Sequence, residues 1–261
     1  MPYPKLQHLI VFAILLLGCK QQKTKNSLNK TQTAQDIINQ SILVSGGDGF
    51  SSSKIRFTFR DKLYMALRNK NTFQLERQFS EDSENSVSEI RDVLSNEGFK
   101  RYINLVVSKV KDSMASKYAA SVNSVHYFSV LPFGLNDDAV KKERLENRFI
   151  KNKNYFSVEV TFKENGGGED FEDKFIYWVN TETFKVDYLA YSYNEGDGKG
   201  MRFREAYNER YIEGLRFVDY NNYKPKMSSA DLKDLPNLFE SGSLDLLSRI
   251  ELKQITVELL N

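Results

Sequence analysis

The chain has 261 residues, and its 37 Lys and Arg residues nearly balance its 35 Asp and Glu residues, giving a formal net charge of +2. Because the cations form no concentrated basic block, this balance argues against a nucleic-acid-binding protein. A single cysteine excludes an internal disulfide and a thiolate metal site, and we expect no cofactor.

The N-terminus has the pattern of a secretory signal peptide. A single cation, Lys5, precedes an apolar run from Leu9 to Leu17, and the small residue Gly18 follows it. The run is about half as long as a helix needs to span a bilayer, so we expect no membrane span here. We therefore predict that residues 1–18 are removed on export.

The tetrad Leu16-Leu17-Gly18-Cys19 resembles the lipobox of bacterial lipoproteins, although that family has Ala or Ser more often where this chain has Leu17. In that family the peptide is cut before the cysteine, which is diacylated through its sulfur, and the new amine is usually acylated too. The resemblance implies that Cys19 is the lipidation site and that the membrane is a partner. The alternative is an ordinary signal peptide that contains a cysteine by chance.

Residues 19–33 are expected to form a flexible polar tether. The segment after Cys19, KQQKTKNSLNKTQT, has four lysines and no aromatic residue, so it cannot bury enough apolar surface to fold. Its reach is about 20 Å by the scaling of flexible coils. Lys20 stands where an acidic residue resembles an inner-membrane retention signal in some bacteria, and no acidic cluster of the kind that marks surface export follows it. We therefore expect a lipid-anchored protein on the periplasmic face of the outer membrane.

Residues 34–261 are predicted to form a single β-rich globular domain, since β-rich domains of this length are common. It begins with a helix at Ala34–Leu43, where apolar residues recur at helical spacing between a Thr33 cap and a Gly46-Gly47 stop. From Lys54 the period changes to two, and short strands separated by turn residues predict an antiparallel meander. The predicted strands are Lys54–Arg60, Leu63–Arg68, Phe73–Phe79, Val87–Leu94 and Phe99–Ile103.

The middle of the chain, Lys109–Val130, predicts one or two helices that end before Pro132. Strands then resume, with a helix near Asp231–Glu240 before the last of them. These strands are Phe156–Phe162, Phe175–Val179, Phe184–Tyr193, Met201–Ile212, Leu215–Tyr223 and Ile250–Leu259.

The predicted fold class is mainly β (α+β). We expect a curved antiparallel sheet or unclosed half-barrel of about 10–11 strands, with an N-terminal helix and a central helical insertion. Strands and helices do not alternate regularly, which argues against a parallel barrel or a doubly wound sheet.

Several strands of the second half are apolar on both faces. In one of them Phe175, Tyr177 and Val179 point one way while Ile176 and Trp178 point the other. A sheet with one face in water does not need this pattern, so either helices cover the second face or the sheet curves around a cavity. The lipobox, a helix ending in Gly-Gly and a meander interrupted by helices together resemble the lipoprotein-sorting carriers. Those are unclosed β half-barrels whose concave face, lidded by helices, holds acyl chains.

A closer resemblance, to a family of uncharacterised bacterial lipoproteins, covers nearly the whole of the domain. It is carried by the stretches SVNSVHYF (121–128), LPFGLND (131–137), FIYWVN (175–180), DYLAYSY (187–193) and FREAYNERYIEGLRFVDYNNYKP (203–225). Neither resemblance assigns catalytic or binding residues.

The candidate ligand-binding residues are aromatic side chains of these strands and two arginines beside them. Arg202, Arg204 and Arg210 share strand parity, so a basic ladder beside an aromatic wall could hold an anionic head group or a carboxylate. The alternative is a solvated face with cross-strand ion pairs. The candidates are Phe175, Tyr177, Trp178, Tyr188, Tyr191, Phe203, Tyr207, Arg202 and Arg204.

Catalytic and metal-binding patterns are weak. His126 is the one histidine left after the signal peptide, no G-x-S-x-G elbow accompanies it, and we expect it to be structural. Lys174 is the candidate for a Schiff-base nucleophile. We nevertheless do not expect an aldolase, because the sequence lacks the pattern of a (β/α)₈ barrel. The acidic residues of segment 169–173 do not have the spacing of a calcium loop, and 195–200 resembles a hairpin loop.

Three functions remain open. The first is a lipid-anchored envelope protein that binds an apolar or acylated ligand, such as a lipid or a lipoprotein, in an aromatic-lined half-barrel cavity. The second is an envelope interaction or sensing module that uses its sheet surface. The third is a periplasmic hydrolase of envelope polymers with paired carboxylates. We expect a binding protein rather than an enzyme.

Overall fold

The computed structural model describes residues 32–83, 86–165, 171–195, 198–227 and 230–260. Residues 32–261 form one compact unit. The predicted signal peptide, Cys19 and most of the predicted tether lie outside the described residues. Within the described part, no helix has both the length and the apolar character needed to cross a membrane.

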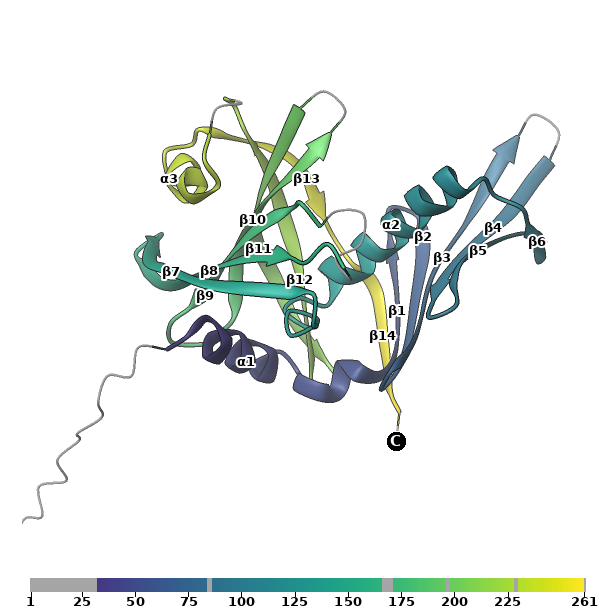
Figure 1. The fold of residues 1–261 in the computed structure, drawn as a ribbon, viewed down its shortest axis with the longest axis horizontal. Coiled ribbons are helices and arrows are strands. Elements are labelled where there is room, and N and C mark those ends of the chain that lie inside the picture. The colour runs from purple at the N-terminus through teal and green to yellow at the C-terminus, as the bar shows by residue number, and fades with distance from the viewer. Residues whose placement is uncertain (1–31, 84–85, 166–170, 196–197, 228–229, 261) are drawn as a thin grey trace, which may run out of the picture. The chain divides into compact units, whose positions relative to one another are not determined.

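The first sheet contains seven antiparallel strands in the spatial order β14-β1-β2-β3-β4-β5-β6 (Figure 1). Hairpins connect most neighbours, and the turn between β1 and β2 places both Arg60 and Asp61 at positive φ, as tight two-residue turns require. The last strand returns to the first, with Lys54 opposite Glu258. The strands are β1 (Ser52–Phe59), β2 (Lys62–Asn69), β3 (Thr72–Ser83), β4 (Ser86–Ser95), β5 (Gly98–Ile103), β6 (Val106–Ser108) and β14 (Lys253–Leu259).

The second sheet also has seven antiparallel strands, in the order β13-β12-β11-β10-β9-β8-β7, and both sheets are unclosed. A bulge interrupts the pairing of β11 with β12 between Tyr207 and Arg210, so side chains change face beyond it. The strands are β7 (Val140–Ile150), β8 (Lys153–Phe162), β9 (Lys174–Asn180), β10 (Val186–Glu195), β11 (Gly198–Ile212), β12 (Leu215–Pro225) and β13 (Leu244–Ile250).

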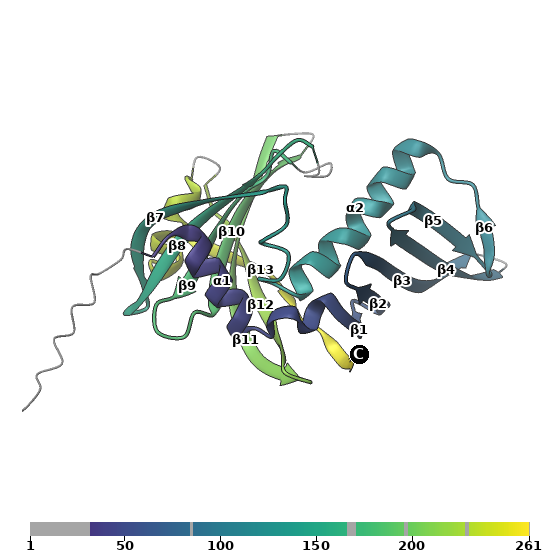
Figure 2. The same cartoon turned by 60° about the horizontal axis from the view of Figure 1, so that its bottom comes forward.

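Helices accompany the two sheets. Helix α1 (Ala34–Val44) begins at the predicted cap, where Thr33 and Asp36 form a reciprocal capping box. The 3₁₀ turn η1 (Gly47–Ser51) then leads into β1. Helix α2 (Asp112–Ser129) packs on β3, β4 and β5 of the first sheet and runs between the two sheets in both views (Figures 1 and 2). The short η2 (Leu232–Asp234) and α3 (Leu235–Glu240) follow β12.

The second sheet is covered on both of its faces, as its sequence pattern indicates. One face, which includes Tyr177, packs in a core with Ile37 and Ile38 of α1. The other face, which includes Trp178, packs in a separate core with Leu235 of α3. Strand β9 is buried from Phe175 to Asn180 for this reason.

The two sheets meet in a shared core. Phe57 of β1 and Phe217 of β12 belong to the same buried cluster. Leu252, between β13 and β14, is fixed where the chain passes from one sheet to the other: its N–H donates to Asp219 Oδ1 at 3.0 Å, and Arg210 Nη2 donates to its carbonyl at 2.7 Å.

The predicted fold class is confirmed: the protein is mainly β, antiparallel and unclosed, with an N-terminal helix and a central helix. The described strands number fourteen in two sheets, where we expected about 10–11. The predicted strand Ile250–Leu259 spans the end of β13 and all of β14, because the backbone of Leu252 is held by Asp219 and Arg210 while the chain changes sheets.

The first sheet has a buried ion-pair cluster that should control its stability. Asp92 is fully buried and accepts hydrogen bonds from Arg77 and Arg101. Replacing Asp92 by Ala leaves two guanidinium groups without their carboxylate, so the free energy of unfolding should fall by about 3–5 kcal/mol in chemical denaturation. As a control, Glu97→Ala removes the exposed pair with Lys100 and should change stability little. Equal effects of the two substitutions would show that the buried cluster stabilises the sheet no more than an exposed ion pair does.

Candidate functional site

A cavity of about 690 Å³ lies between helix α2 and the second sheet. Most of its lining residues are aliphatic or aromatic. Val218 and Tyr220 of β12 form part of its wall, and Phe59 and Leu94 contribute from the first sheet. The aromatic wall of the second sheet consists of Phe162, Phe175, Tyr191, Tyr193 and Tyr220.

The cavity exists because α2 presents small side chains to this aromatic wall. Along the helix, residues at helical spacing face the space but fill little of it. They are Ser116, Ala119, Ala120, Asn123 and Ser124. At the C-terminal end of the helix, Phe128 packs against Tyr191 with 5.3 Å between ring centroids, and the Tyr127 and Tyr177 hydroxyls lie 2.9 Å apart. Burial raises the pKa of both phenols, so this pair stays neutral.

One charged side chain is buried in the cavity wall. Arg204 of β11 is 7% exposed, and its Nη2 donates to the Tyr191 hydroxyl at 2.7 Å. Its guanidinium lies 3.8 Å from the ring centroid of Phe128, a cation–π contact that partly offsets the loss of water. The Nε and Nη1 atoms have no hydrogen-bond partner.

Helix α2 is held to the first sheet by buried polar contacts. Arg77 Nη1 donates to Ser121 Oγ at 2.7 Å. His126, 1% exposed, contacts the Glu76 carbonyl through Nε2 at 3.0 Å, so Nε2 carries the proton and donates. Rings of Phe57 and Tyr64 pack edge-on against the imidazole. His126 therefore has a structural setting, away from the cavity lining.

The structure distributes the predicted ligand-binding residues over two faces. Phe175, Tyr191 and Arg204 line the cavity, and Tyr177 is buried on the same face. The opposite face holds Trp178, Tyr188 and Phe203, which pack in the core with α3.

The remaining candidates lie outside the main cavity lining. Trp178 also borders a smaller cavity of about 300 Å³ with Ile176 and Arg148. Arg202 lies over the Tyr193 ring, and the Tyr207 hydroxyl donates to Glu251.

Sequence reasoning did not identify Phe128, Tyr220 or Asn222 as cavity residues. Tyr220 and Asn222 share strand parity with Val218, and that period of two was a usable signal. Phe128 could not be assigned, because the orientation of α2 toward the second sheet depends on its contacts with the first.

The weaker chemical candidates have ordinary surroundings. Lys174 is exposed and lies 3.3 Å from Glu159, so it lacks the burial that a Schiff-base nucleophile needs. Within the described residues, no group of three His, Cys, Asp or Glu side chains is arranged to hold a metal ion. Glu169 and Asp170 of the acidic segment lie outside the described residues, as do Gly196 and Asp197 of the 195–200 loop.

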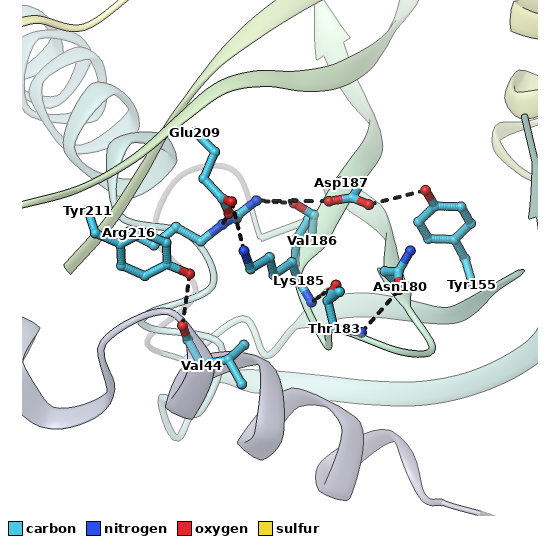
Figure 3. Close-up of polar contacts among 10 residues, drawn as sticks. All are labelled: Val44, Tyr155, Asn180, Thr183, Lys185, Val186, Asp187, Glu209, Tyr211 and Arg216. Carbon is cyan, nitrogen blue, oxygen red and sulfur yellow. Dashed lines mark hydrogen bonds and ion pairs between the residues drawn. The ribbon is translucent and has the colours of Figure 1, made fainter. Parts of the chain in front are cut away.

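A polar network beside α1 contains two carboxylates, Asp187 and Glu209, that pair with the same arginine (Figure 3). Arg216 is almost fully buried and lies between Glu209, at 2.5 Å, and Asp187, at 3.9 Å. Burial raises the Asp187 pKa, and Tyr155 donates to this carboxyl at 3.1 Å. Burial opposes ionisation of Glu209, but hydrogen bonds from Arg216 and Lys185 lower its pKa. Both acids are engaged by protein partners, and neither lines either of the two cavities described above.

An exposed apolar turn is the feature that an interaction module would use. Leu105, in the turn between β5 and β6, and Val106 and Val107, at the start of β6, are 87%, 69% and 63% exposed. Nothing in the structure shows what covers them, whereas the cavity has a defined lining.

Comparison with known proteins identifies a family and several similar folds. A family model described as "Family of unknown function (DUF6503)" matches residues 12–252, and no curated protein matches the chain. The match confirms the predicted uncharacterised family, while lipoprotein character stays a prediction.

Three solved structures are similar to the chain. A LolA superfamily protein from Nitrosomonas europaea has 13% identity, covers 88% of this chain and 94% of its own, and has a TM-score of 0.44. A DUF1329 family protein from Desulfovibrio piger has 8% identity, 87% and 93% coverage, and a TM-score of 0.38. A putative outer membrane lipoprotein-sorting protein domain from Vibrio parahaemolyticus has 8% identity, 79% and 97% coverage, and a TM-score of 0.42. At these scores the similarities carry no functional argument, so the function proposed below rests on the cavity.

His126 should make the fold sensitive to acid. Burial lowers its pKa from 6.5 to about 4, so between these values the unfolded chain binds a proton that the folded chain does not. The contribution of neutral His126 to the free energy of unfolding is therefore fully present above pH 6.5. It is lost as the pH falls, by about 3 kcal/mol between pH 7 and pH 4. The variant His126→Gln keeps an amide donor near the Glu76 carbonyl. We expect its free energy of unfolding to fall by about 3 kcal/mol less than that of the unmodified protein between pH 7 and pH 4, as measured by denaturation followed by Trp178 fluorescence. Parallel pH profiles of the two proteins would show that His126 is not the cause.

Proposed function

We propose that this chain, which belongs to the DUF6503 family of unknown function, binds a ligand with an apolar chain in the cavity between α2 and the second sheet. The observation that carries this proposal is the cavity of about 690 Å³ with its mainly aliphatic and aromatic lining. Its volume falls in the range typical of small-molecule sites, about 300–1,000 Å³.

Burial of apolar surface supplies the binding energy in such a site. Each methylene group transferred from water contributes roughly 0.8 kcal/mol, so a long chain gains several kcal/mol against rings such as Phe175 and Tyr220. The aromatic wall is already formed by contacts within the protein, with Phe175 stacked on Tyr191 at 5.2 Å between centroids. A preformed wall reduces the entropy that binding costs.

The lining favours binding over catalysis. In the part of the chain that the structure describes, Asp173 is the one carboxylate that borders the cavity, and no histidine borders it. Acid–base chemistry usually needs two titratable groups with different roles. The hydrolase hypothesis is therefore less well supported than ligand binding.

We also propose that the protein is exported and anchored through lipidated Cys19, on the periplasmic face of the outer membrane. The support is the signal-peptide pattern and the tetrad at residues 16–19, followed by Lys20. Two acyl chains hold a protein stably at a membrane where one does not. An anchored binding protein of this kind would take a lipid or a lipoprotein as its ligand.

Filling the cavity tests the binding function. We expect Ala120→Trp, on the α2 face that borders the cavity, to reduce the bound fraction of added hexadecanol about tenfold, because the indole takes the space of the chain. The full mature protein would be purified in detergent and measured by native mass spectrometry, first for co-purified lipid and then with hexadecanol.

The matched control is Ala115→Trp, which lies on the same helix but does not border the cavity and should bind as the unmodified protein does. The proposed function would be contradicted if the unmodified protein carried no adduct either before or after incubation with hexadecanol. An equal loss in both variants would show that the effect comes from α2 as a whole.

Cys19 lipidation can be tested by metabolic labelling. Cells fed an alkyne analogue of palmitate should label the full chain, and Cys19→Ala should abolish the label, since no other residue has a thiol. Label that persists in Cys19→Ala, or none in the unmodified chain, contradicts the anchor.

A further inference from the structure

We propose that the ligand of this cavity is an amphiphile whose carboxylate binds Arg204. The inference rests on the proposed function, because it assumes that an apolar chain occupies the rest of the cavity. It adds the chemical class of the head group and the residue that selects it.

Arg204 differs from Arg77 and Arg216, which are also buried, because it has no carboxylate partner among the described residues. Arg77 pairs with Asp92 at 2.6 Å, and Arg216 pairs with Glu209 at 2.5 Å. In the part of the chain that the structure describes, no carboxylate forms an ion pair with Arg204, and Nε and Nη1 have no partner at all. A buried guanidinium without a counter-ion is unfavourable, so an anion that reaches it gains a charge-assisted hydrogen bond.

The neighbours of Arg204 can complete an anion site. The Tyr191 hydroxyl accepts from Arg204 and keeps its own hydrogen as a donor. Asn222 is paired opposite Arg204 on β12 and also borders the cavity. Its Nδ2 contacts Ser248 Oγ at 3.1 Å while its Oδ1 has no partner. A half-turn of the Asn222 amide lets Oδ1 accept from Ser248 and lets Nδ2 donate to the ligand.

The charge of the lining selects a monoanion. Among the residues that the structure describes, two cations, Arg60 and Arg204, and one anion, Asp173, border the cavity, which leaves a net charge of +1. Asp173 has interactions of its own. A carboxylate matches this balance, whereas a phosphate monoester brings close to two negative charges that one buried guanidinium does not neutralise.

The head group must move Phe128 to reach the guanidinium. The Phe128 ring covers Arg204 at 3.8 Å, and neither unpartnered nitrogen exposes surface to solvent. Phe128 is the second-to-last residue of α2, so we expect a change of its rotamer, rather than a displacement of the helix, to open the site.

A competition experiment tests this assignment on the full mature protein in detergent. An equimolar mixture of palmitic acid, hexadecanol and hexadecyl phosphate is added at about pH 8, and native mass spectrometry reads the three adducts from one sample. We expect the acid adduct to exceed the alcohol adduct about tenfold, as a hydrogen bond to a charged group predicts. In Arg204→Met, which replaces the buried cation by an apolar side chain of similar length, the ratio should fall to about one.

Two further variants keep the result interpretable. Arg202→Met removes a half-buried arginine from the same strand that does not border the cavity, and it should retain the preference for the acid. Arg204→Gln removes the charge but keeps an amide donor, so it should lose the preference too, even if Arg204→Met does not fold.

Each outcome is decisive. Equal acid and alcohol adducts on the unmodified protein, or a preference that survives in both Arg204 variants, overturns the Arg204 assignment and leaves the apolar cavity intact. A phosphate adduct larger than the acid adduct overturns the carboxylate class. Adducts of none of the three overturn the proposed function itself, and this inference with it.

Discussion

The cavity depends on one constraint: helix α2 must pack against one sheet while facing another. Its contacts with the first sheet, through Ser121 and His126, fix which side chains point away from that sheet. Those side chains are small, such as Ala119 and Ala120, and they face a wall of aromatic rings. Protein interiors are normally filled to the density of crystals, so a space of this size reflects small residues at positions where larger ones would pack.

Buried arginines in both sheets pair with carboxylates, and Arg204 is an exception. In the first sheet, the buried acids Glu76 and Asp92 are each met by arginines, so the polar layer under α2 is internally neutralised. In the second sheet, Glu209 likewise pairs with Arg216, whereas Arg204 has aromatic rings and a phenol in place of a carboxylate. A neutralised layer stabilises the fold, because removing one partner leaves a charge unpaired in a low-dielectric interior. A buried cation without a carboxylate can instead form its ion pair with a ligand. The difference separates a structural polar layer from a site that can recognise a ligand.

Much of the fold could be predicted from periodicity, but the contacts between distant elements could not. The alternation in 175–179 indicated burial of both faces of β9, and it also placed Phe175 on one face and Trp178 on the other. Strand parity grouped Arg202 with Arg204 but could not show that Arg210 leaves their face, because the bulge after Tyr207 depends on pairing with β12. The nearness of Asn222 to Arg204 follows from that same register, and a sequence alone does not specify which residues of two strands lie opposite each other.

The pairing of β1 with β14 has a consequence for how the protein reaches its folded state. Residues near the start of the domain, such as Ser53, lie opposite Leu259, so β1 gains its second neighbour only after almost the whole chain has been synthesised. Until then one edge of the first sheet offers unpaired N–H and C=O groups to any passing strand. Long-range pairings of this kind also slow folding, since the intervening loop must be closed before the contact forms. A chaperone that shields strand edges would therefore act on this chain during the interval between synthesis of β1 and synthesis of β14.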